Sequence, residues 1–86
     1  MNLYKHKPKI VNAFKWDGFQ NTLTKNVNRM ELKSFSVNGN HNLTIHTDQG
    51  SMLCAIGDYV IQNGINDYYC CKHIDFRNNY SLVDKG

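Results

Sequence analysis

The second half of the sequence is a succession of short apolar runs separated by turn-forming residues. Four runs follow one another in this part of the chain: NLTIHT, SMLCAI, YVIQ and DYYCCK. Thr47-Asp48-Gln49-Gly50, Gly57-Asp58 and Asn63-Gly64 lie between them, and Gly50 can adopt a positive φ. Because runs of this length suit strands, and tight turns join antiparallel neighbours, the pattern predicts a series of short antiparallel strands.

The N-terminal segment, LYKHKPKIVNAFKWDG, is predicted to form one extended strand that ends at the Asp17-Gly18 turn. Apolar side chains two residues apart share one face of this strand: Ile10, Phe14 and Trp16. Two more lie on the opposite face: Val11 and Ala13. Pro8 has no N–H to donate, which places the early part of the strand at a sheet edge or before pairing begins.

The spacing of apolar residues changes between Asn21 and Phe35. Leu23, Val27 and Met30 follow the i, i+4, i+7 spacing of a short amphipathic helix, with Asn21 or Thr22 as its N-cap. The surrounding Asn, Thr and Ser residues are poor helix formers, so this helix depends on packing against the sheet.

These segments predict one α+β domain over residues 1–86: a curved antiparallel sheet of about five strands with one short helix packed on a face. The last segment, HIDFRNNYSLV, is expected to add a helical turn and a short closing strand. No signal peptide is visible, and no apolar stretch approaches the roughly 20 residues of a membrane-spanning helix. We therefore expect the chain to act in a reducing cytoplasm, away from membranes.

The three cysteines are Cys54, Cys70 and Cys71. An odd number in a short chain argues against a disulfide framework, although Cys54 could approach either of the others in space. Cys70 and Cys71 are neighbours on a predicted strand, so their side chains point to opposite faces. Cys71 and His73 could form a fragment of a metal site, but the Cys-x-x-Cys spacing is absent, and we predict no metal site and no cofactor.

Catalytic motifs are missing from the sequence. It has no Gly-x-Ser-x-Gly motif, no Walker loop and no dinucleotide glycine pattern. Most of its seven acidic residues lie next to Gly, Asn or a turn, where Asp is expected for backbone reasons. We therefore predict that the protein is not an enzyme and has no catalytic residues.

Basic and aromatic residues provide the candidates for binding. Lys5, Lys7 and Lys9 alternate along the N-terminal segment, and their ammonium groups would line one face of an extended chain beside aromatic rings. The competing explanation is that these lysines protect an edge strand from aggregation. The predicted binding residues are Lys5, Lys7, Trp16, Tyr59, Tyr68, Tyr69 and Lys72. The net charge of +3 permits an anionic partner without demanding one.

Two stretches of the sequence carry a resemblance to a known family. They are YKHKPKIVNAFKWDG and LTIHTDQGSMLCAIGDYVIQNGINDYYCCKHIDFRNNY. They resemble the two ends of a family of small bacteriophage and prophage proteins named for a Pro-Gly-Asp-Tyr-Gly motif, while residues 19–41 lie outside the resemblance. The matching positions are Pro8, Trp16, Gly57, Asp58, Tyr59, Tyr69, Cys71, Lys72, Phe76 and Tyr80. Ile56 stands where the motif has proline, and Cys70 and His73 stand where prolines flank Cys-Lys. The resemblance implies a viral origin and a fold more than a reaction.

These observations lead to four hypotheses about function. The first is a non-enzymatic phage accessory protein that binds and inhibits a host protein or protein–RNA complex, for example in counter-defence as anti-CRISPR proteins do. The second is a sponge for an anionic nucleotide second messenger, with contacts from Lys5, Lys7, Lys72 and Tyr59 and with walls from two subunits of a homo-oligomer. The third, which the missing motifs disfavour, is an enzyme or metal protein that uses Cys70, Cys71 and His73. The fourth is a minor structural phage protein.

Overall fold

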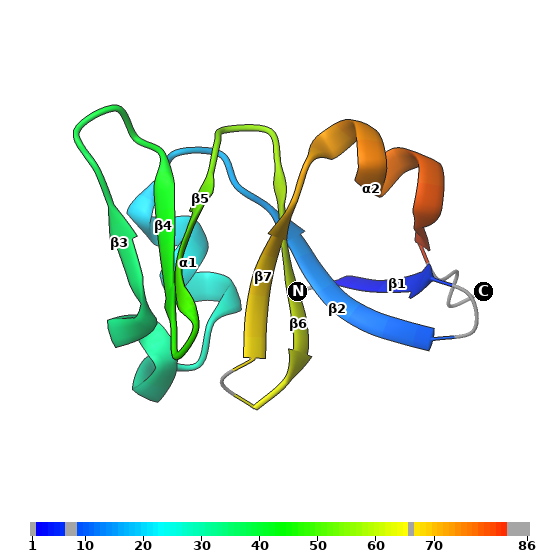
Figure 1. Ribbon diagram of the computed structural model, residues 1–86, viewed down its shortest axis with the longest axis horizontal. Helices are drawn as coiled ribbons and strands as arrows, with labels where there is room; N and C mark the ends of the chain where they lie inside the picture. Colours follow the sequence, from blue (N-terminus) through cyan, green and yellow to red (C-terminus); the bar gives the residue numbers. More distant parts are fainter. Residues whose placement is uncertain (1, 7–8, 66, 83–86) are drawn as a thin grey trace.

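The computed structural model describes residues 2–6, 9–65 and 67–82 of the 86-residue chain. Eight strands, two α-helices and one 3₁₀ helix, η1, follow one another along it (Figure 1). They are β1 (Asn2–His6), β2 (Lys9–Lys15), α1 (Gln20–Asn26), η1 (Arg29–Ser34), β3 (Phe35–Val37), β4 (Leu43–Thr47), β5 (Gly50–Cys54), β6 (Tyr59–Gly64), β7 (Asp67–Cys71), α2 (His73–Asn79) and β8 (Ser81–Leu82).

The strands form two antiparallel sheets. The larger sheet has five strands in the order β7-β6-β2-β1-β8, and the smaller has three in the order β3-β4-β5. Figure 1 shows the smaller sheet and α1 on the left and the long strands of the larger sheet in the centre and on the right. The predicted α+β class and antiparallel pairing are confirmed. A single sheet was expected, and the short strands of the second half are instead divided between two sheets.

The N-terminal segment forms a hairpin and not one strand. β1 pairs antiparallel with β2, so that Tyr4 lies opposite Val11 and Lys5 opposite Ile10. The chain therefore reverses between His6 and Lys9, and Pro8 lies outside the described residues. The single-strand prediction is wrong because Pro8 was interpreted only as a sign of a sheet edge, although proline also favours turns.

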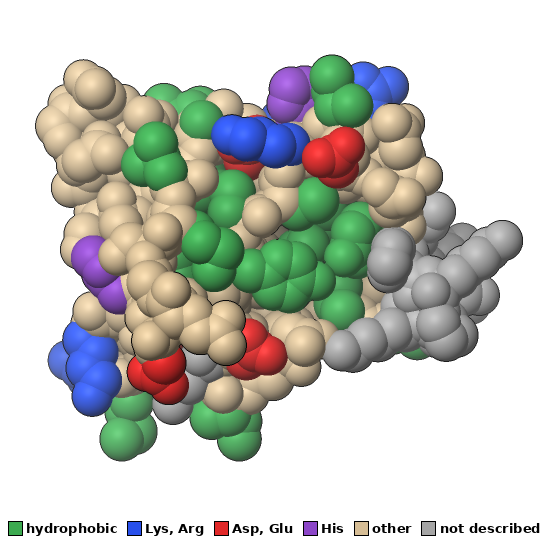
Figure 2. Space-filling view, in the orientation of Figure 1, with side chains coloured by type: hydrophobic (Ala, Val, Ile, Leu, Met, Phe, Trp, Pro, Cys, Tyr) green, Lys and Arg blue, Asp and Glu red, His purple; other side chains and the backbone are tan. Residues whose placement is uncertain are grey.

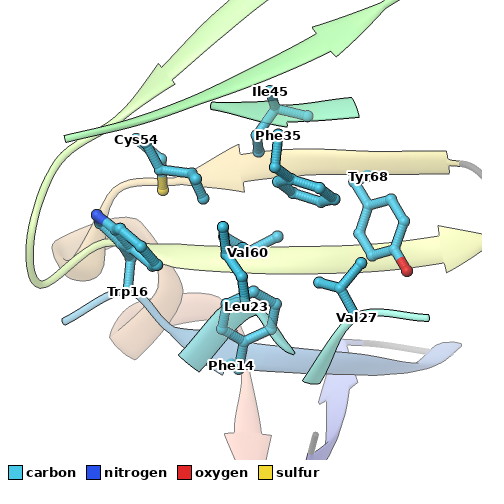
Figure 3. Close-up of a cluster of buried hydrophobic side chains, with 10 residues drawn as sticks. Phe14, Trp16, Leu23, Val27, Phe35, Ile45, Cys54, Val60 and Tyr68 are labelled. Carbon is cyan, nitrogen blue, oxygen red and sulfur yellow. The ribbon is translucent and has the colours of Figure 1, made fainter. Parts of the chain in front are cut away.

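The main core lies between the two sheets and is closed by α1. Figure 3 shows side chains from both sheets and from α1 converging around Val60. The buried residues of this core are Phe14, Trp16, Leu23, Val27, Phe35, Leu43, Ile45, Cys54, Val60 and Tyr68. Ile10, expected on the same face as Phe14, is 55% exposed. It lies at the start of β2, the end that points away from the smaller sheet (Figure 1), so no second layer covers it.

The opposite face of the larger sheet carries a second, smaller core. Val11, Ala13 and Ile61 pack there against Phe76 of α2. The central strands β2 and β6 are therefore buried on both faces, which explains why both sets of alternating residues in β2 are apolar.

The single short helix that was predicted is divided into α1 and the 3₁₀ helix η1. Val27 ends α1 in an extended conformation, and the Asn28 side chain accepts a hydrogen bond from the Met30 N–H at the start of η1. This break turns Met30 outward, where it is 82% exposed, and buries Glu31. The N-cap of α1 is Phe19, which makes no side-chain cap bond, so the prediction of Asn21 or Thr22 is wrong.

The predicted turns are confirmed where glycine is required. Gly50 has a φ of 124° in the β4–β5 turn, and Gly57 has a φ of 99° between β5 and β6. Residues other than glycine rarely adopt such φ values. The C-terminal expectation also holds, because α2 is followed by β8, which pairs with β1.

Candidate functional site

Trp16 and Tyr68, two of the predicted binding residues, lie in the main core. Trp16 is fully buried, and its Nε1–H donates to the His41 carbonyl oxygen at 2.8 Å. Tyr68 is 3% exposed, and its hydroxyl donates to Glu31 Oε1 at 3.1 Å. Burial, together with this hydrogen bond, raises the pKa of Tyr68, which keeps the hydroxyl protonated as a donor. The expectation of an exposed binding role is therefore wrong for both residues.

The predicted basic face is not formed as expected. Lys5 lies in β1 opposite Ile10, whereas Lys9 begins the neighbouring strand β2. Lys7 lies outside the described residues. Lys5 and Lys9 are therefore on two paired strands and do not follow one another along a single strand.

The other predicted tyrosines form an aromatic group on the second core. The Tyr59 ring stacks on Phe76 with centroids 3.9 Å apart, and Phe76 stacks on Tyr80 at 4.6 Å. Tyr4 meets the edge of Phe76 at 4.6 Å. The hydroxyls of Tyr69 and Tyr80 are 3.2 Å apart, at hydrogen-bonding distance. Such ring pairs stabilise a protein beyond the area they bury, by about 0.5–1.5 kcal/mol each.

We call the half-buried side chains around Phe76 the tyrosine face; they are Tyr4, Tyr59, Tyr69, Cys71 and Tyr80. Figure 1 shows α2 beside the upper ends of β6 and β7, away from their lower ends. Figure 2 shows a continuous hydrophobic area in the middle of this side of the molecule, with charged side chains at its margins. The structure therefore brings Tyr59 and Tyr69 to one surface and places Tyr68 on the other side of the same sheet.

A hollow of about 640 Å³ adjoins the tyrosine face at Tyr69. The charged side chains around it are of both signs: Lys33, Asp48 and Asp67. His46 lines it too, and is hydrogen-bonded to Ser36 Oγ at 2.9 Å and to Ser51 Oγ at 3.1 Å. A serine, a histidine and an orienting group in this order resemble a nucleophile and its base. All three are exposed on the outer face of the smaller sheet, where such bonds are ordinary cross-strand pairing.

Asp58 organises the junction between the β5–β6 turn and the start of α2. Its carboxylate is 5% exposed and accepts hydrogen bonds from the Ala55 N–H at 3.3 Å and the His73 N–H at 3.2 Å. The Lys72 ammonium lies 3.4 Å from Oδ2. Burial alone raises the pKa of the Asp58 carboxyl, but the bonds from His73, Ala55 and Lys72 together hold it below its ordinary value. Asp58 is thus a buried, ionised carboxylate that connects the β5–β6 turn to the start of α2. Lys72 already has this carboxylate as a partner.

A disulfide bond joins Cys54 of β5 to Cys70 of β7, with Cα atoms 5.6 Å apart. It links the smaller sheet to the larger one. The expectation of no disulfide is wrong, because the pairing depends on how β5 packs against β7, which cysteine counting does not reveal. The opposite orientation of the adjacent cysteines is confirmed, since Cys70 packs on the main core and Cys71 on the second.

The two sulfur atoms of Cys54 and Cys70 and a carboxylate oxygen of Asp58 all lie within 4.8 Å of one another. His73 Nδ1 is 3.7 Å from Asp58 Oδ1. From the sequence, only Cys70, Cys71 and His73 were considered as metal ligands, and the contribution of Cys54 and Asp58 was missed. A signal was present, because Asp58 follows Cys54 by four residues and His73 follows Cys70 by three.

Comparison of the chain with family models, curated proteins and solved structures finds no match. Among the described residues, no helix is long and apolar enough to cross a membrane.

Proposed function

We propose that the chain is a non-catalytic binding protein that inhibits a host protein by covering part of its surface with the tyrosine face. The observation that carries the proposal is that the rings of Tyr59 and Tyr69 are only half-buried against the second core, on one face of the larger sheet. Figure 2 shows a hydrophobic area in the middle of one side of the molecule. Tyrosine is enriched at protein interfaces because one side chain offers a large apolar ring and a polar hydroxyl at a low cost in conformational entropy.

The charges around this face favour a protein partner over a nucleotide. A phosphate site needs concentrated positive charge or several N–H donors. Lys72, the predicted phosphate contact, is held at 3.4 Å from the buried Asp58 carboxylate. Asp67 lines the adjoining hollow, so an incoming phosphate would meet an acidic side chain there. The hollow has the mixed lining that suits a side chain from a protein partner.

The resemblance to small phage proteins supports a host factor as the partner and counter-defence as the purpose. Both remain predictions from the sequence. The structural-protein alternative predicts that the chain is found in purified virions, which mass spectrometry of virions tests directly.

Affinity capture from host lysate with a matched set of variants tests the proposal. Tyr69→Glu places a charge in the tyrosine face, whereas Met30→Glu and Ile65→Glu place the same charge at side chains that are 82% and 89% exposed elsewhere. Met30 lies in η1 and Ile65 between β6 and β7, at the lower edge of Figure 1. A folded state is verified for each variant by circular dichroism.

We expect one host protein to be captured by the wild type and by both controls, and to be reduced at least about tenfold with Tyr69→Glu, since a buried charge at an interface centre costs more than about 1.4 kcal/mol. Purified partner and chain should then bind with the same ranking in calorimetry. Equal binding by folded Tyr69→Glu would show that the tyrosine face is not the contact surface.

A further inference from the structure

We propose that Cys54, Asp58, Cys70 and His73 form a zinc site when the Cys54–Cys70 disulfide is reduced. The two sulfur atoms and an Asp58 carboxylate oxygen already lie within 4.8 Å of one another. His73 Nδ1 lies 3.7 Å from Asp58 Oδ1. Two thiolates, a carboxylate and an imidazole are all established Zn²⁺ ligands and complete a tetrahedral set. This inference is independent of the tyrosine face and of any protein partner.

The placement of the ligands along the chain is that of a structural zinc site. One pair, Cys54-x₃-Asp58, spans the turn between β5 and β6, and the other, Cys70-x₂-His73, spans the connection from β7 to α2. Structural sites commonly take two ligands from each of two such segments, separated by about two to four residues. The positive φ of Gly57 bends the first segment so that Asp58 turns back toward Cys54.

Asp58 is already oriented by the surrounding backbone. The His73 N–H donates to Oδ1, which keeps a further lone pair for a metal ion, and the Ala55 N–H and the Lys72 ammonium donate to Oδ2. Outer hydrogen bonds of this kind fix the direction of a ligating carboxylate. The Lys72 ammonium lies 3.4 Å from Oδ2, and its charge would offset the net negative charge of two thiolates and a carboxylate around Zn²⁺.

His73 is the ligand that must move. Its side chain is 57% exposed, so rotation about its side-chain torsions meets little packing resistance. Its backbone N–H stays bonded to Asp58 Oδ1 at 3.2 Å, which keeps the residue beside the site.

The Cys54–Cys70 disulfide is reduced by thiol–disulfide exchange. A dithiol supplies two electrons and two protons, the Cys54–Cys70 bond breaks to give two thiols, and the dithiol becomes its own disulfide. Zn²⁺ then replaces the two thiol protons, which are released to solvent. In a reducing cytoplasm, the compartment predicted from the sequence, the thiol form that binds zinc would be the prevailing one.

Cys71 provides the matched control. It packs on the second core, across the sheet from the proposed ligands, and its thiol donates to the Lys72 carbonyl oxygen at 3.6 Å. Cys70→Ser and Cys71→Ser therefore make the same chemical change on two faces of one strand. Only the first removes a ligand.

The test is a Zn²⁺ titration of the purified chain, with a chromophoric chelator as competitor, before and after reduction with a phosphine. We expect one Zn²⁺ per reduced chain and less than about a tenth of an equivalent per oxidised chain, since the disulfide leaves no thiolates. Cys71→Ser should bind like the wild type. Cys70→Ser, Asp58→Asn and His73→Gln should each bind at least about tenfold more weakly.

A second readout keeps the test valid if a variant unfolds. Co²⁺ added to the reduced wild type should give the intense visible bands of a tetrahedral ion and the near-ultraviolet charge-transfer band of thiolate ligation. Stoichiometric binding with these bands supports the site. No binding by the reduced wild type, Co²⁺ spectra without thiolate bands, or equal loss of affinity in Cys71→Ser would overturn it.

Discussion

The bond between Cys54 and Cys70 gives the most quantitative prediction about stability. Its ends are 16 residues apart in sequence. In the chain-entropy description, closing a loop of about this length in the unfolded state stabilises the native state by ~3 kcal/mol at 25 °C. Reduction in the presence of a metal chelator is therefore expected to lower the free energy of unfolding by about that amount.

The corresponding change in melting temperature follows from the size of the chain. A chain of 86 residues has an unfolding entropy of roughly 0.18 kcal/mol/K near its Tm, at about 2.1 cal/mol/K per residue. A loss of ~3 kcal/mol then lowers Tm by about 17 °C. Because Cys54 is fully buried between the sheets, the thiol that reduction releases lies in an apolar site.

Thermal unfolding followed by circular dichroism, with and without a phosphine, measures this change. Alkylation and mass spectrometry of the unfolded samples establish which thiols are free. Cys71→Ser should show the same fall in Tm on reduction as the wild type, and the double variant Cys54→Ser/Cys70→Ser should show none. A fall of less than about 5 °C in fully reduced wild type would refute the reasoning, because the bond would then not constrain the unfolded chain as calculated.

Three further predictions concern single side chains. The hydrogen bonds at Asp58 hold the pKa of its carboxyl in the folded state below the ordinary value of 3.8. The ionised carboxylate therefore contributes its full stabilisation of the folded state above pH 3.8, and this contribution is lost as the pH falls through the lowered pKa. In urea unfolding, the stability of Asp58→Asn should depend less on acid pH than that of the wild type. Gly57→Ala should lower the free energy of unfolding by about 1–3 kcal/mol, because φ is 99° at this position. Gly39→Ala is the control, since φ is not positive there and an added methyl group would meet no other atom; it should lower the free energy of unfolding by no more than about 0.5 kcal/mol. Equal losses for the two variants in urea unfolding would contradict the backbone argument. Ile61→Ala should lower the free energy of unfolding by about 2–5 kcal/mol, because Ile61 is fully buried. Ile65→Ala is the control: Ile65 is 89% exposed, so the same assay should show a change within about 0.5 kcal/mol.

Local features of the fold could be predicted because they depend on neighbouring residues alone. Alternating apolar residues identified most of the strands, and Gly50 and Gly57 identified turns whose φ values only glycine adopts readily. The opposite orientation of Cys70 and Cys71 followed from the two-residue period of a strand.

The candidate sites were predicted less completely. Tyr59, Tyr68 and Tyr69 were all expected to be exposed binding residues, but the side chain of Tyr68 enters the main core. The sequence alone does not distinguish a tyrosine with an exposed ring from a buried one with a hydrogen-bonded hydroxyl. Tyr68 is of the second kind, because its hydroxyl donates to Glu31. The Asp58 group was missed because its members come from two segments that only the tertiary fold brings together.

By itself, the sequence determined the α+β class, the antiparallel pairing and the glycine turns, because these depend on side-chain periodicity and backbone sterics within a few residues. Only the tertiary structure decided that the strands divide into two sheets, that β2 and β6 are buried on both faces, and that Cys54 meets Cys70. The physical reason is that these features depend on which apolar faces cover one another. Many pairings of short apolar strands bury similar area, and the choice among them is made by packing across the whole chain.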